Sequence, residues 1–332
     1  MSTCVDIAQR LVVPGKGLLA ADESLRTIKR RFDPLGIPST EETRRAYRDT
    51  LFTTPGIEAY ISGVIMFEET LGQATSSGES FPDLLARLGI IPGIKVDRGL
   101  VPLNGITRET LTQGLDGLRE RLPIYRRQGA RFAKWRGAIH IEGSHLPTPY
   151  AMAANAAALA RYARLCQDAE LMPIVEPEVL MDGEPDIARS AEVTRATLQA
   201  VFEALNQADV SLEGMLLKPN MVAPVSAASH REAASRIAEA TLRCLRRSVP
   251  PAVPGIVFLS GGQSPQVATD HLREIVRLGG TLPWRISFSF GRALQDEALA
   301  AWRGRPENVG VAQTAFLNRA KSVSVASLGR TD

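Results

Sequence analysis

The sequence is poor in the residues that build disulfide frameworks and metal centres. Its three cysteines are widely spaced and form no CxxC pair, so we interpret them as small apolar side chains in a reducing compartment. Its four histidines show no HxH or HExxH spacing, and the pattern therefore gives a metal centre little support. We expect neither a metal nor another cofactor.

Long apolar runs and a strong charge of one sign are also missing. No segment approaches the roughly 20 apolar residues that a membrane-spanning helix needs. Residues 1–10 carry Asp6 and Arg10 and lack the apolar core of a signal peptide. The 39 basic and 36 acidic residues give a net charge of +3, which is far from the footprint of a nucleic-acid-binding protein. We expect a cytoplasmic protein that binds neither membranes nor nucleic acid.

What the sequence does contain is a series of apolar runs separated by helical segments. The runs cover residues 17–21, 61–67, 91–96, 130–135, 171–175, 214–217, 256–259 and 284–290. Stretches between them, such as 190–206 and 233–247, have the 3.6-residue period of helices. Strands alternating with helices indicate a parallel sheet, and eight units predict an α/β fold, a closed (β/α)8 TIM barrel. An open, doubly wound sheet is the alternative. Because no linker divides the chain, we predict a single domain over residues 1–332.

Charged or phosphate-binding residue types follow most of these runs. In chain order they are Asp22-Glu23-Ser24, Lys95-Val96-Asp97-Arg98, Lys134-Trp135-Arg136, Glu176-Pro177-Glu178, Lys218, Ser260-Gly261-Gly262 and Gly291-Arg292. The carboxyl ends of barrel strands converge on one face, where the active site lies. One polar strand end would mean little, but seven of eight predict an active site on that face.

Lys218 ends the sixth run and is followed by Pro219, which cannot continue a strand. A lone lysine in such a place usually buries its stem and keeps its ammonium group in water. Here Lys134 ends a nearby strand, and Glu176 lies between the two lysines in strand order. A second cation favours the free amine that a Schiff base requires, and Glu176 could supply and remove protons. The alternative for Glu176 and Glu178 is a structural ion pair with one of the lysines.

The last two strands are followed by loops that suit a phosphate group. Glycines let backbone N–H groups approach an anion, and Arg292 offers a two-pronged donor. The loops after strands 7 and 8 are the usual phosphate site of this barrel, although the same glycines could serve only tight turns. Lys95 and Arg98, after the third strand, could reach a second phosphate. We predict a solvated helix face for the arginines Arg119, Arg121, Arg126, Arg127 and Arg131.

Seven stretches together resemble class I fructose-bisphosphate aldolase, in family order from residue 18 to residue 295. They are residues 18–24 (LLAADES), 93–97 (GIKVD), 132–136 (FAKWR), 175–178 (VEPE), 216–222 (LLKPNMV), 258–264 (FLSGGQS) and 289–295 (SFGRALQ). The resemblance implies a metal-independent enzyme of glycolysis and gluconeogenesis. It would cleave fructose 1,6-bisphosphate reversibly to dihydroxyacetone phosphate and glyceraldehyde 3-phosphate.

The resemblance also implies a role for each candidate residue. Lys218 would form the Schiff base with the ketone carbon, and Asp22 would deprotonate the C4 hydroxyl. Glu176 would transfer protons during imine formation and hydrolysis. Lys134 would hold the charges of the site in place, and Glu178 would support this network of charged side chains. For the phosphate next to the ketone, the candidates are Ser260, Gly261, Gly291 and Arg292, with Gly262 and Ser289 in the same loops. For the distal end of the substrate, the candidates are Ser24 and Lys95, with Thr27 and Arg136 as further substrate-binding residues.

Two departures from the family pattern stand out. The family's Thr-Gly-Ser is Leu25-Arg26-Thr27 here, which replaces a glycine by a cation near the distal phosphate. The animal enzymes also carry a tail ending in a tyrosine that assists protonation of the enamine, whereas the last tyrosine here is Tyr162. We expect that aid to be absent or replaced by another group.

Family members are mostly homotetramers, so a homo-oligomer is expected. Two alternatives to the leading hypothesis remain at this point. One is a different Schiff-base barrel enzyme, such as a transaldolase or an aldolase for monophosphorylated sugars, and the other is a binding or scaffold protein that has lost catalysis.

Overall fold

The computed structural model describes residues 3–105, 108–180, 185–224 and 231–331. His230, one of the four histidines, therefore lies outside the described residues. Among the residues that are described, no helix is both long and apolar enough to cross a membrane.

Eight parallel strands close into a barrel, in the spatial order β1-β10-β9-β8-β7-β6-β3-β2. The strands are β1 (Gly17–Ala21), β2 (Ile61–Met66), β3 (Ile91–Lys95), β6 (Phe132–Ile139), β7 (Met172–Val179), β8 (Leu216–Leu217), β9 (Gly255–Phe258) and β10 (Arg285–Phe290). The barrel closes where β1 pairs with β10, with Leu18 opposite Ser289 and Leu19 opposite Phe290. The predicted TIM barrel is confirmed, and the open sheet is excluded.

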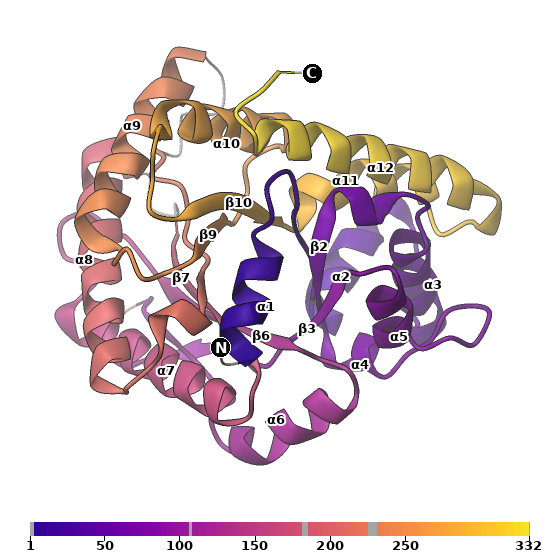
Figure 1. Ribbon diagram of the computed structural model, residues 1–332, viewed down its shortest axis with the longest axis horizontal. Coiled ribbons are helices and arrows are strands. Elements are labelled where there is room, and N and C mark those ends of the chain that lie inside the picture. Colours follow the sequence, from indigo (N-terminus) through magenta and orange to yellow (C-terminus); the bar gives the residue numbers. More distant parts are fainter. Residues whose placement is uncertain (1–2, 106–107, 181–184, 225–230, 332) are drawn as a thin grey trace.

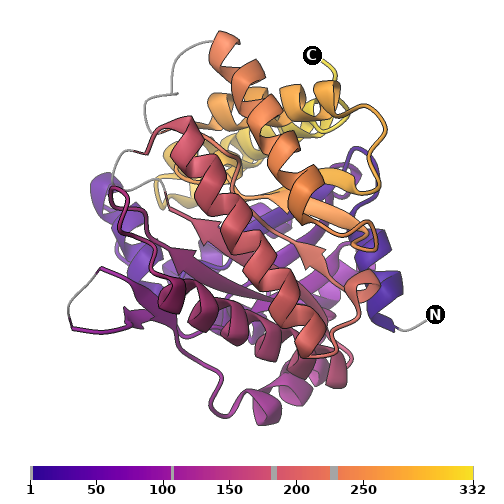
Figure 2. The same cartoon turned by 90° about the vertical axis from the view of Figure 1, so that its left-hand side faces the viewer.

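Helices surround the barrel (Figure 1). They are α1 (Thr3–Leu11), α2 (Leu25–Phe32), α3 (Glu41–Phe52), α4 (Glu68–Leu71), α5 (Phe81–Arg87), α6 (Leu118–Arg127), α7 (Pro149–Asp168), α8 (Ile187–Gln207), α9 (Arg231–Ser248), α10 (Pro265–Gly279), α11 (Arg292–Trp302) and α12 (Val309–Ala326). The long helices α7, α8 and α9 run side by side along one flank (Figure 2). Several helices begin at a capping hydroxyl; Thr148, for example, accepts a hydrogen bond from the Ala151 amide at the start of α7.

Helix α1 covers the amino-terminal end of the barrel. Its buried side chains Cys4, Ile7 and Leu11 form one apolar cluster with inward-facing strand residues that include Phe132 and Leu216. Since this end is filled with apolar side chains, polar chemistry is confined to the opposite end, where barrel active sites lie.

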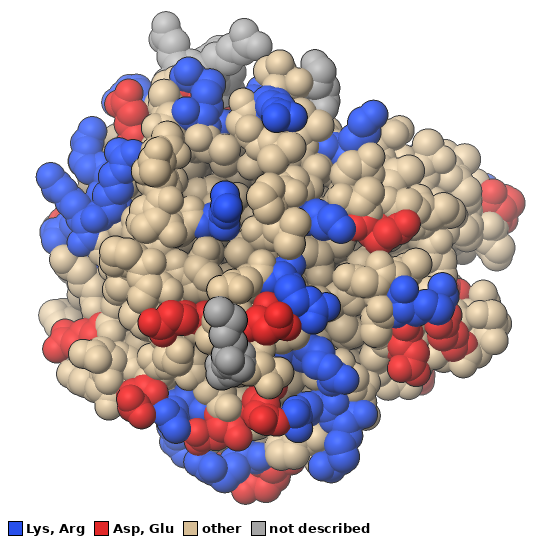
Figure 3. All heavy atoms as spheres, in the orientation of Figure 1, with Lys and Arg blue, Asp and Glu red and all other residues tan. Residues whose placement is uncertain are grey.

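The surface on the α1 side carries Lys, Arg, Asp and Glu side by side (Figure 3). Lys and Arg gather over α8 and α9, at the left of that view. This cluster includes Arg195, Arg243, Arg246 and Arg247. Elsewhere on this face the two signs are interspersed, in keeping with the small net charge.

Two of the predicted strands extend further than expected. β6 continues to Ile139 and β7 to Val179, so Lys134 and Glu176 lie inside strands and not at their ends. The two predicted runs end just before Arg136 and Glu176, but this barrel tolerates both charged residues inside its strands. Conversely, Gly214 is not in the sixth strand, because Leu212–Gly214 forms a 3-10 turn before β8.

A short hairpin was not predicted. Between β3 and β6 the chain forms the antiparallel strands β4 (Leu100–Pro102) and β5 (Thr110–Thr112). The hairpin is attached to the barrel by Thr112, whose hydroxyl donates to the Arg136 carbonyl at 2.6 Å. Three-residue strands with little alternation leave a weak signal in the sequence, which explains why they were missed.

Candidate active site

Four charged side chains, two from strands β6 and β7 and two from the residues that directly follow β1 and β8, meet inside the carboxyl end of the barrel. Lys134 Nζ lies 2.7 Å from Asp22 Oδ2 and 3.2 Å from Glu176 Oε2. Lys218 Nζ lies 3.1 Å from the other oxygen of Glu176, Oε1. Glu176 thus bridges the two lysines, in the strand order that the sequence predicted. Lys134, Glu176 and Lys218 are each only 4% exposed.

The backbone places these groups with little freedom. Asp22 is the first residue after β1, Lys134 and Glu176 lie on the adjacent strands β6 and β7, and Lys218 follows β8 directly. The amide of Lys218 donates to the Val175 carbonyl at 2.8 Å, which sets Lys218 next to Glu176 across the two strands. Alternation along β6 and β7 turns every second side chain to the same face.

The mutual attraction of these charges fixes their protonation. Burial alone would raise the pKa of Asp22, but the charges of Lys134 and Lys218 outweigh burial and lower it to about 2. The pKa of Glu176 is lowered for the same reason, with Lys134 the largest opposing influence to burial. Burial would lower the pKa of Lys134, but Asp22 and Glu176 raise it well above its ordinary value. At neutral pH the site therefore holds two carboxylates and the Lys134 ammonium group.

A cavity of about 800 Å³ opens beside Asp22, on the side of α2 and the loop after β3. Its lining includes the predicted substrate-binding residues Ser24, Thr27, Lys95 and Arg136. Lys95 Nζ lies 2.6 Å from Asp97 Oδ1, so its charge is already partly matched.

The start of α2 turns two hydroxyl groups toward this cavity. The Thr27 amide donates to Ser24 Oγ at 3.3 Å, so Ser24 caps the helix, and the two hydroxyl oxygens are 3.1 Å apart. Arg26, the residue that departs from the family pattern, is exposed and lines the same cavity.

The loops after β9 and β10 lie against each other. Gly261 and Gly262 both have left-handed φ angles, 56° and 80°, which favour glycine. A Cβ atom on Gly262 would lie 3.3 Å from Arg292 Nη2, so the guanidinium group sits over the glycine backbone. Gly291 precedes α11, and Arg292 is its first residue. Ser260 and Ser289, predicted for the same phosphate, are buried.

Comparison with known proteins agrees with this geometry. A family model described as "Fructose-bisphosphate aldolase class-I" matches residues 4–332. "Fructose-bisphosphate aldolase 4, cytosolic" of Arabidopsis thaliana is 53% identical over 95% of this chain and 80% of its own length. "Probable fructose-bisphosphate aldolase class 1" of Xanthomonas campestris pv. campestris is 50% identical over 98% of this chain and 97% of its own. The chain belongs to the class I fructose-bisphosphate aldolase family.

A solved aldolase structure has the same fold as this chain. The fructose-bisphosphate aldolase of Plasmodium falciparum, in a ternary co-crystal structure with TRAP and a small-molecule inhibitor, superposes with a TM-score of 0.96 at 48% identity. The match covers 99% of this chain and 95% of that chain. The closed barrel and the element order are thus those of an aldolase.

Glu178, predicted to support the network of this aldolase, pairs with Arg136. The Arg136 Nε atom donates to Glu178 Oε2, between the adjacent strands β6 and β7. An ion pair was the alternative for Glu178, with a lysine as the expected partner. The partner is an arginine because Arg136, two residues beyond Lys134, points to the same face of β6.

One arginine of the aldolase was assigned to the wrong environment. Arg121 was predicted on a solvated helix face, but it is half-buried and lines the cavity. Its guanidinium group donates to the Val96 and Gly114 carbonyls at 3.1 and 2.6 Å and to the Tyr125 hydroxyl at 3.1 Å. It therefore holds the loop after β3 against α6, a tertiary role that helical spacing alone does not indicate.

A second layer of charge behind Asp22 was not predicted. Glu23 and Gln295 lie within two of the stretches that resemble the family, residues 18–24 and 289–295, but no role was predicted for either side chain. Both are drawn into one buried cluster with Arg31 and Arg48. The only signal was their place next to candidate residues, since their partners come from helices that are distant in the sequence.

Proposed function

We propose that Lys218 is the Schiff-base nucleophile of this class I fructose-bisphosphate aldolase. The family activity is the metal-independent, reversible cleavage of fructose 1,6-bisphosphate in glycolysis and gluconeogenesis. The observation that carries the assignment is the placement of Lys218 3.1 Å from Glu176, whose other oxygen faces Lys134. Such an amine has a proton acceptor in direct contact.

Imine formation then follows from a proton that passes from Lys218 to Glu176 and from there to the departing hydroxyl group. If Lys218 passes a proton to Glu176, the lysine becomes a free amine and the glutamate becomes an acid in the same step. The amine attacks the C2 ketone to give a carbinolamine. Glu176 returns its proton to the C2 hydroxyl, which leaves as water, and a protonated imine remains. Lys134 stays charged and stabilises the carboxylates.

Cleavage requires a base at the C4 hydroxyl, and we assign it to Asp22. Its lowered pKa keeps it a carboxylate at neutral pH, ready to accept the hydroxyl proton. As that proton leaves, C4 becomes the aldehyde carbon and the C3–C4 electron pair moves into the protonated imine. The products are glyceraldehyde 3-phosphate and an enamine on Lys218. Protonation of the enamine at C3 and hydrolysis of the imine release dihydroxyacetone phosphate.

The two phosphate groups would occupy opposite sides of this centre. The end of β10 and the adjoining loops after β9 and β10 suit the C1 phosphate, which would be bound by Ser260, Gly261, Gly262, Ser289, Gly291 and Arg292. The cavity beside Asp22 suits the C6 phosphate, with Ser24, Thr27 and Lys95 as ligands. Arg136, held by Glu178, would face the substrate between the two ends. Two separate cationic sites favour a bisphosphate over a monophosphate.

Borohydride trapping tests the assignment of the nucleophile. Reduction in the presence of dihydroxyacetone phosphate should attach the substrate to Lys218, as found by peptide mass spectrometry. Lys134, which is equally buried and contacts the same glutamate, is the internal control. An adduct on Lys134, or no adduct at all, would overturn the proposal. Activity that survives EDTA is a second expectation of a covalent lysine mechanism.

We further propose that the chain is one domain over residues 1–332 and a cytoplasmic homo-oligomer, a tetramer by resemblance to its family. Support for the location comes from relatives named as cytosolic, and support for the single domain from the family match over residues 4–332. Sedimentation velocity at several concentrations tests the oligomeric state, and a constant monomer mass would contradict it.

A further inference from the structure

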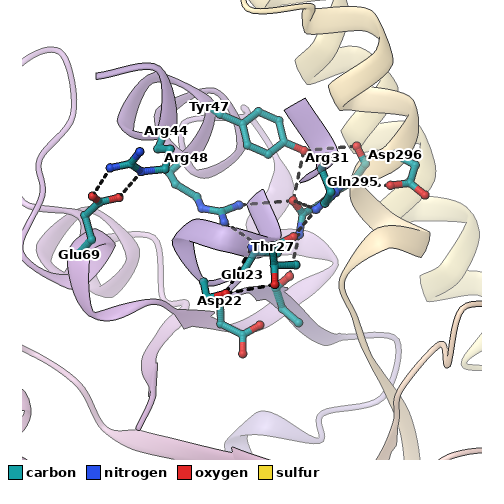
Figure 4. Close-up of polar contacts among 12 residues, drawn as sticks. Asp22, Glu23, Thr27, Arg31, Arg44, Tyr47, Arg48, Glu69, Gln295 and Asp296 are labelled. Carbon is teal, nitrogen blue, oxygen red and sulfur yellow. Dashed lines mark hydrogen bonds and ion pairs between the residues drawn. The ribbon is translucent and has the colours of Figure 1, made fainter. Parts of the chain in front are cut away.

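A buried polar cluster lies directly behind Asp22 (Figure 4). It consists of Glu23, Arg31, Arg48 and Gln295 and is called the Glu23 cluster here. One oxygen of the Glu23 carboxylate accepts from Arg31, and the other accepts from Arg48 Nη2 at 2.6 Å. Gln295 Nε2 donates to Glu23 Oε1 at 3.1 Å. The side chains come from the loop after β1 and from helices α2, α3 and α11.

The cluster attaches the end of β1 to helix α11. Gln295, which is fully buried, donates to the Ala20 carbonyl at 2.7 Å as well as to Glu23. Its own carbonyl oxygen Oε1 accepts from Arg31 Nη1 and from the Tyr47 hydroxyl, each at 3.1 Å. The backbone on both sides of Asp22 is thus held, at Ala20 by Gln295 and at Glu23 by the whole cluster.

The charges make this attachment strong. Arg48 is 3% exposed, and the Arg31 side chain is 10% exposed. Burial would raise the pKa of Glu23, but Arg48 and Arg31 outweigh burial and lower it. A neutral side chain in place of Glu23 would leave the buried guanidinium group of Arg48 without its carboxylate, and Arg31 would keep only the carboxylate of Asp296, whose side chain is 46% exposed, at 3.0 Å. The loop would then relax to rehydrate the Arg48 guanidinium group.

We propose that the Glu23 cluster positions Asp22 for carbon–carbon cleavage, so that its loss slows cleavage far more than it slows Schiff-base formation. The inference rests on the proposed roles of Asp22 and Lys218. Asp22 follows β1 as part of a loop, whereas Lys134, Glu176 and Lys218 are set by the paired strands β6, β7 and β8. A shift of the loop would therefore move the base and leave the nucleophile and its proton acceptor in place.

The chain offers a matched control on the same helix. Arg44, also on α3, forms a two-pronged ion pair with Glu69, with Nε–Oε1 at 2.7 Å and Nη2–Oε2 at 2.5 Å. The two side chains are 14% and 21% exposed. Figure 4 shows this pair pointing away from Asp22, on the other side of Arg48. It is a half-buried arginine–glutamate pair with the same chemistry and without contact to the Glu23 cluster.

The experiment compares Glu23→Gln with Glu69→Gln. Three quantities are measured: kcat for fructose 1,6-bisphosphate cleavage, the rate of borohydride trapping of dihydroxyacetone phosphate on Lys218, and Tm. For Glu23→Gln we expect kcat to fall by roughly 10- to 100-fold, since a misplacement near 1 Å can cost about that much. Its trapping rate should stay within about two-fold of wild type, and Glu69→Gln should keep both rates within about two-fold.

The conservative pair Arg48→Lys and Arg44→Lys repeats the comparison if Glu23→Gln does not fold. Lysine retains the positive charge of arginine but not its planar, two-pronged donor geometry. Arg48→Lys should therefore lower kcat by several-fold, whereas Arg44→Lys should not. A purely structural role predicts that cleavage and trapping fall together, or that both members of a matched pair lower kcat equally; either result overturns the inference. If wild type itself is not trapped on Lys218, the proposed function fails instead, so the two failures are distinguishable.

Discussion

Replacement of Lys134 by methionine tests whether the buried charges stabilise one another. Methionine retains most of the length and apolar volume of lysine but removes the ammonium group. That group lies 2.7 Å from Asp22 and 3.2 Å from Glu176. Glu176 keeps Lys218 as a partner, whereas Asp22 loses its nearest cation. Asp22 should therefore be the carboxylate that loses most of its charge stabilisation.

The expected cost follows from the geometry. Two unit charges 2.7 Å apart attract by about 6 kcal/mol at an effective dielectric constant of about 20. Desolvation of the two ions offsets much of this attraction, but removal of one partner leaves the other buried and unpaired. Such a loss typically destabilises by about 3–5 kcal/mol. We expect Lys134→Met to lower the free energy of unfolding by that amount at neutral pH.

A double-mutant cycle isolates the coupling between the two side chains. Unfolding by urea is followed by circular dichroism and by tryptophan fluorescence, whose transitions must coincide for a two-state treatment. In an Asp22→Asn background no carboxylate is left unpaired at residue 22, so Lys134→Met should cost about 2–3 kcal/mol less than in wild type. If it costs the same in both backgrounds within about 0.5 kcal/mol, the reasoning is refuted.

An exposed pair of the same chemistry serves as the control. Lys29 Nζ lies 2.7 Å from Asp33 Oδ1, the same separation, but the two side chains are 61% and 51% exposed. The cycle with Lys29→Met and Asp33→Asn should give a coupling of about 0.5 kcal/mol or less, because water screens both charges. Equal coupling in the two cycles would show that burial is not the source of the effect.

Three further predictions concern binding, stability against pH and packing. Arg26→Ala should raise KM for fructose 1,6-bisphosphate about five-fold, because the loss of one exposed charge contact costs about 1 kcal/mol. KM for fructose 1-phosphate, which lacks the C6 phosphate, should stay unchanged. Equal effects on the two KM values would contradict a role for Arg26 at the C6 phosphate. Because the pKa of Asp22 is lowered to about 2, its stabilisation, about 2 kcal/mol, is present above pH 4 and lost as the pH falls toward 2; urea melts of Asp22→Asn should therefore show a shallower pH dependence than wild type. Gly93→Ala should lower the free energy of unfolding by about 1–3 kcal/mol, since its Cβ would lie 2.2 Å from the Phe132 ring; an unchanged urea midpoint would contradict it.

The architecture could be predicted because each strand of a parallel barrel is buried and leaves an apolar run. The same feature explains the errors at β6 and β7, where Arg136 and Glu176 follow the predicted apolar runs but lie inside the strands. An interior charge looks like a strand end unless its partner is known. The partner comes from the neighbouring strand, and a single sequence does not reveal that contact.

The residues of the candidate site fall into two groups, those on neighbouring strands, which could be predicted, and those that helices bring together, which could not. Lys134, Glu176 and Lys218 could be brought together in advance because strand order alone makes them neighbours. The Glu23 cluster could not, since Arg31 and Arg48 reach Glu23 from two helices and Gln295 arrives from the far end of the chain. Helical spacing indicates which side of a helix is buried, but not which buried arginine meets which carboxylate.

Charge balance connects the two layers of the site to its substrate. Lys134 and Lys218 are matched by Asp22 and Glu176, so the centre can stay buried without a counter-ion. The adjoining cavity is different, because its lining includes six arginine and lysine residues and four acidic ones. A sugar phosphate that enters brings the missing negative charge to the cavity wall and not to the lysines. The cavity can therefore attract substrate while the contact between Glu176 and Lys218 stays undisturbed. In the mechanism proposed above, that separation leaves Lys218 and its proton acceptor in place for attack on the ketone.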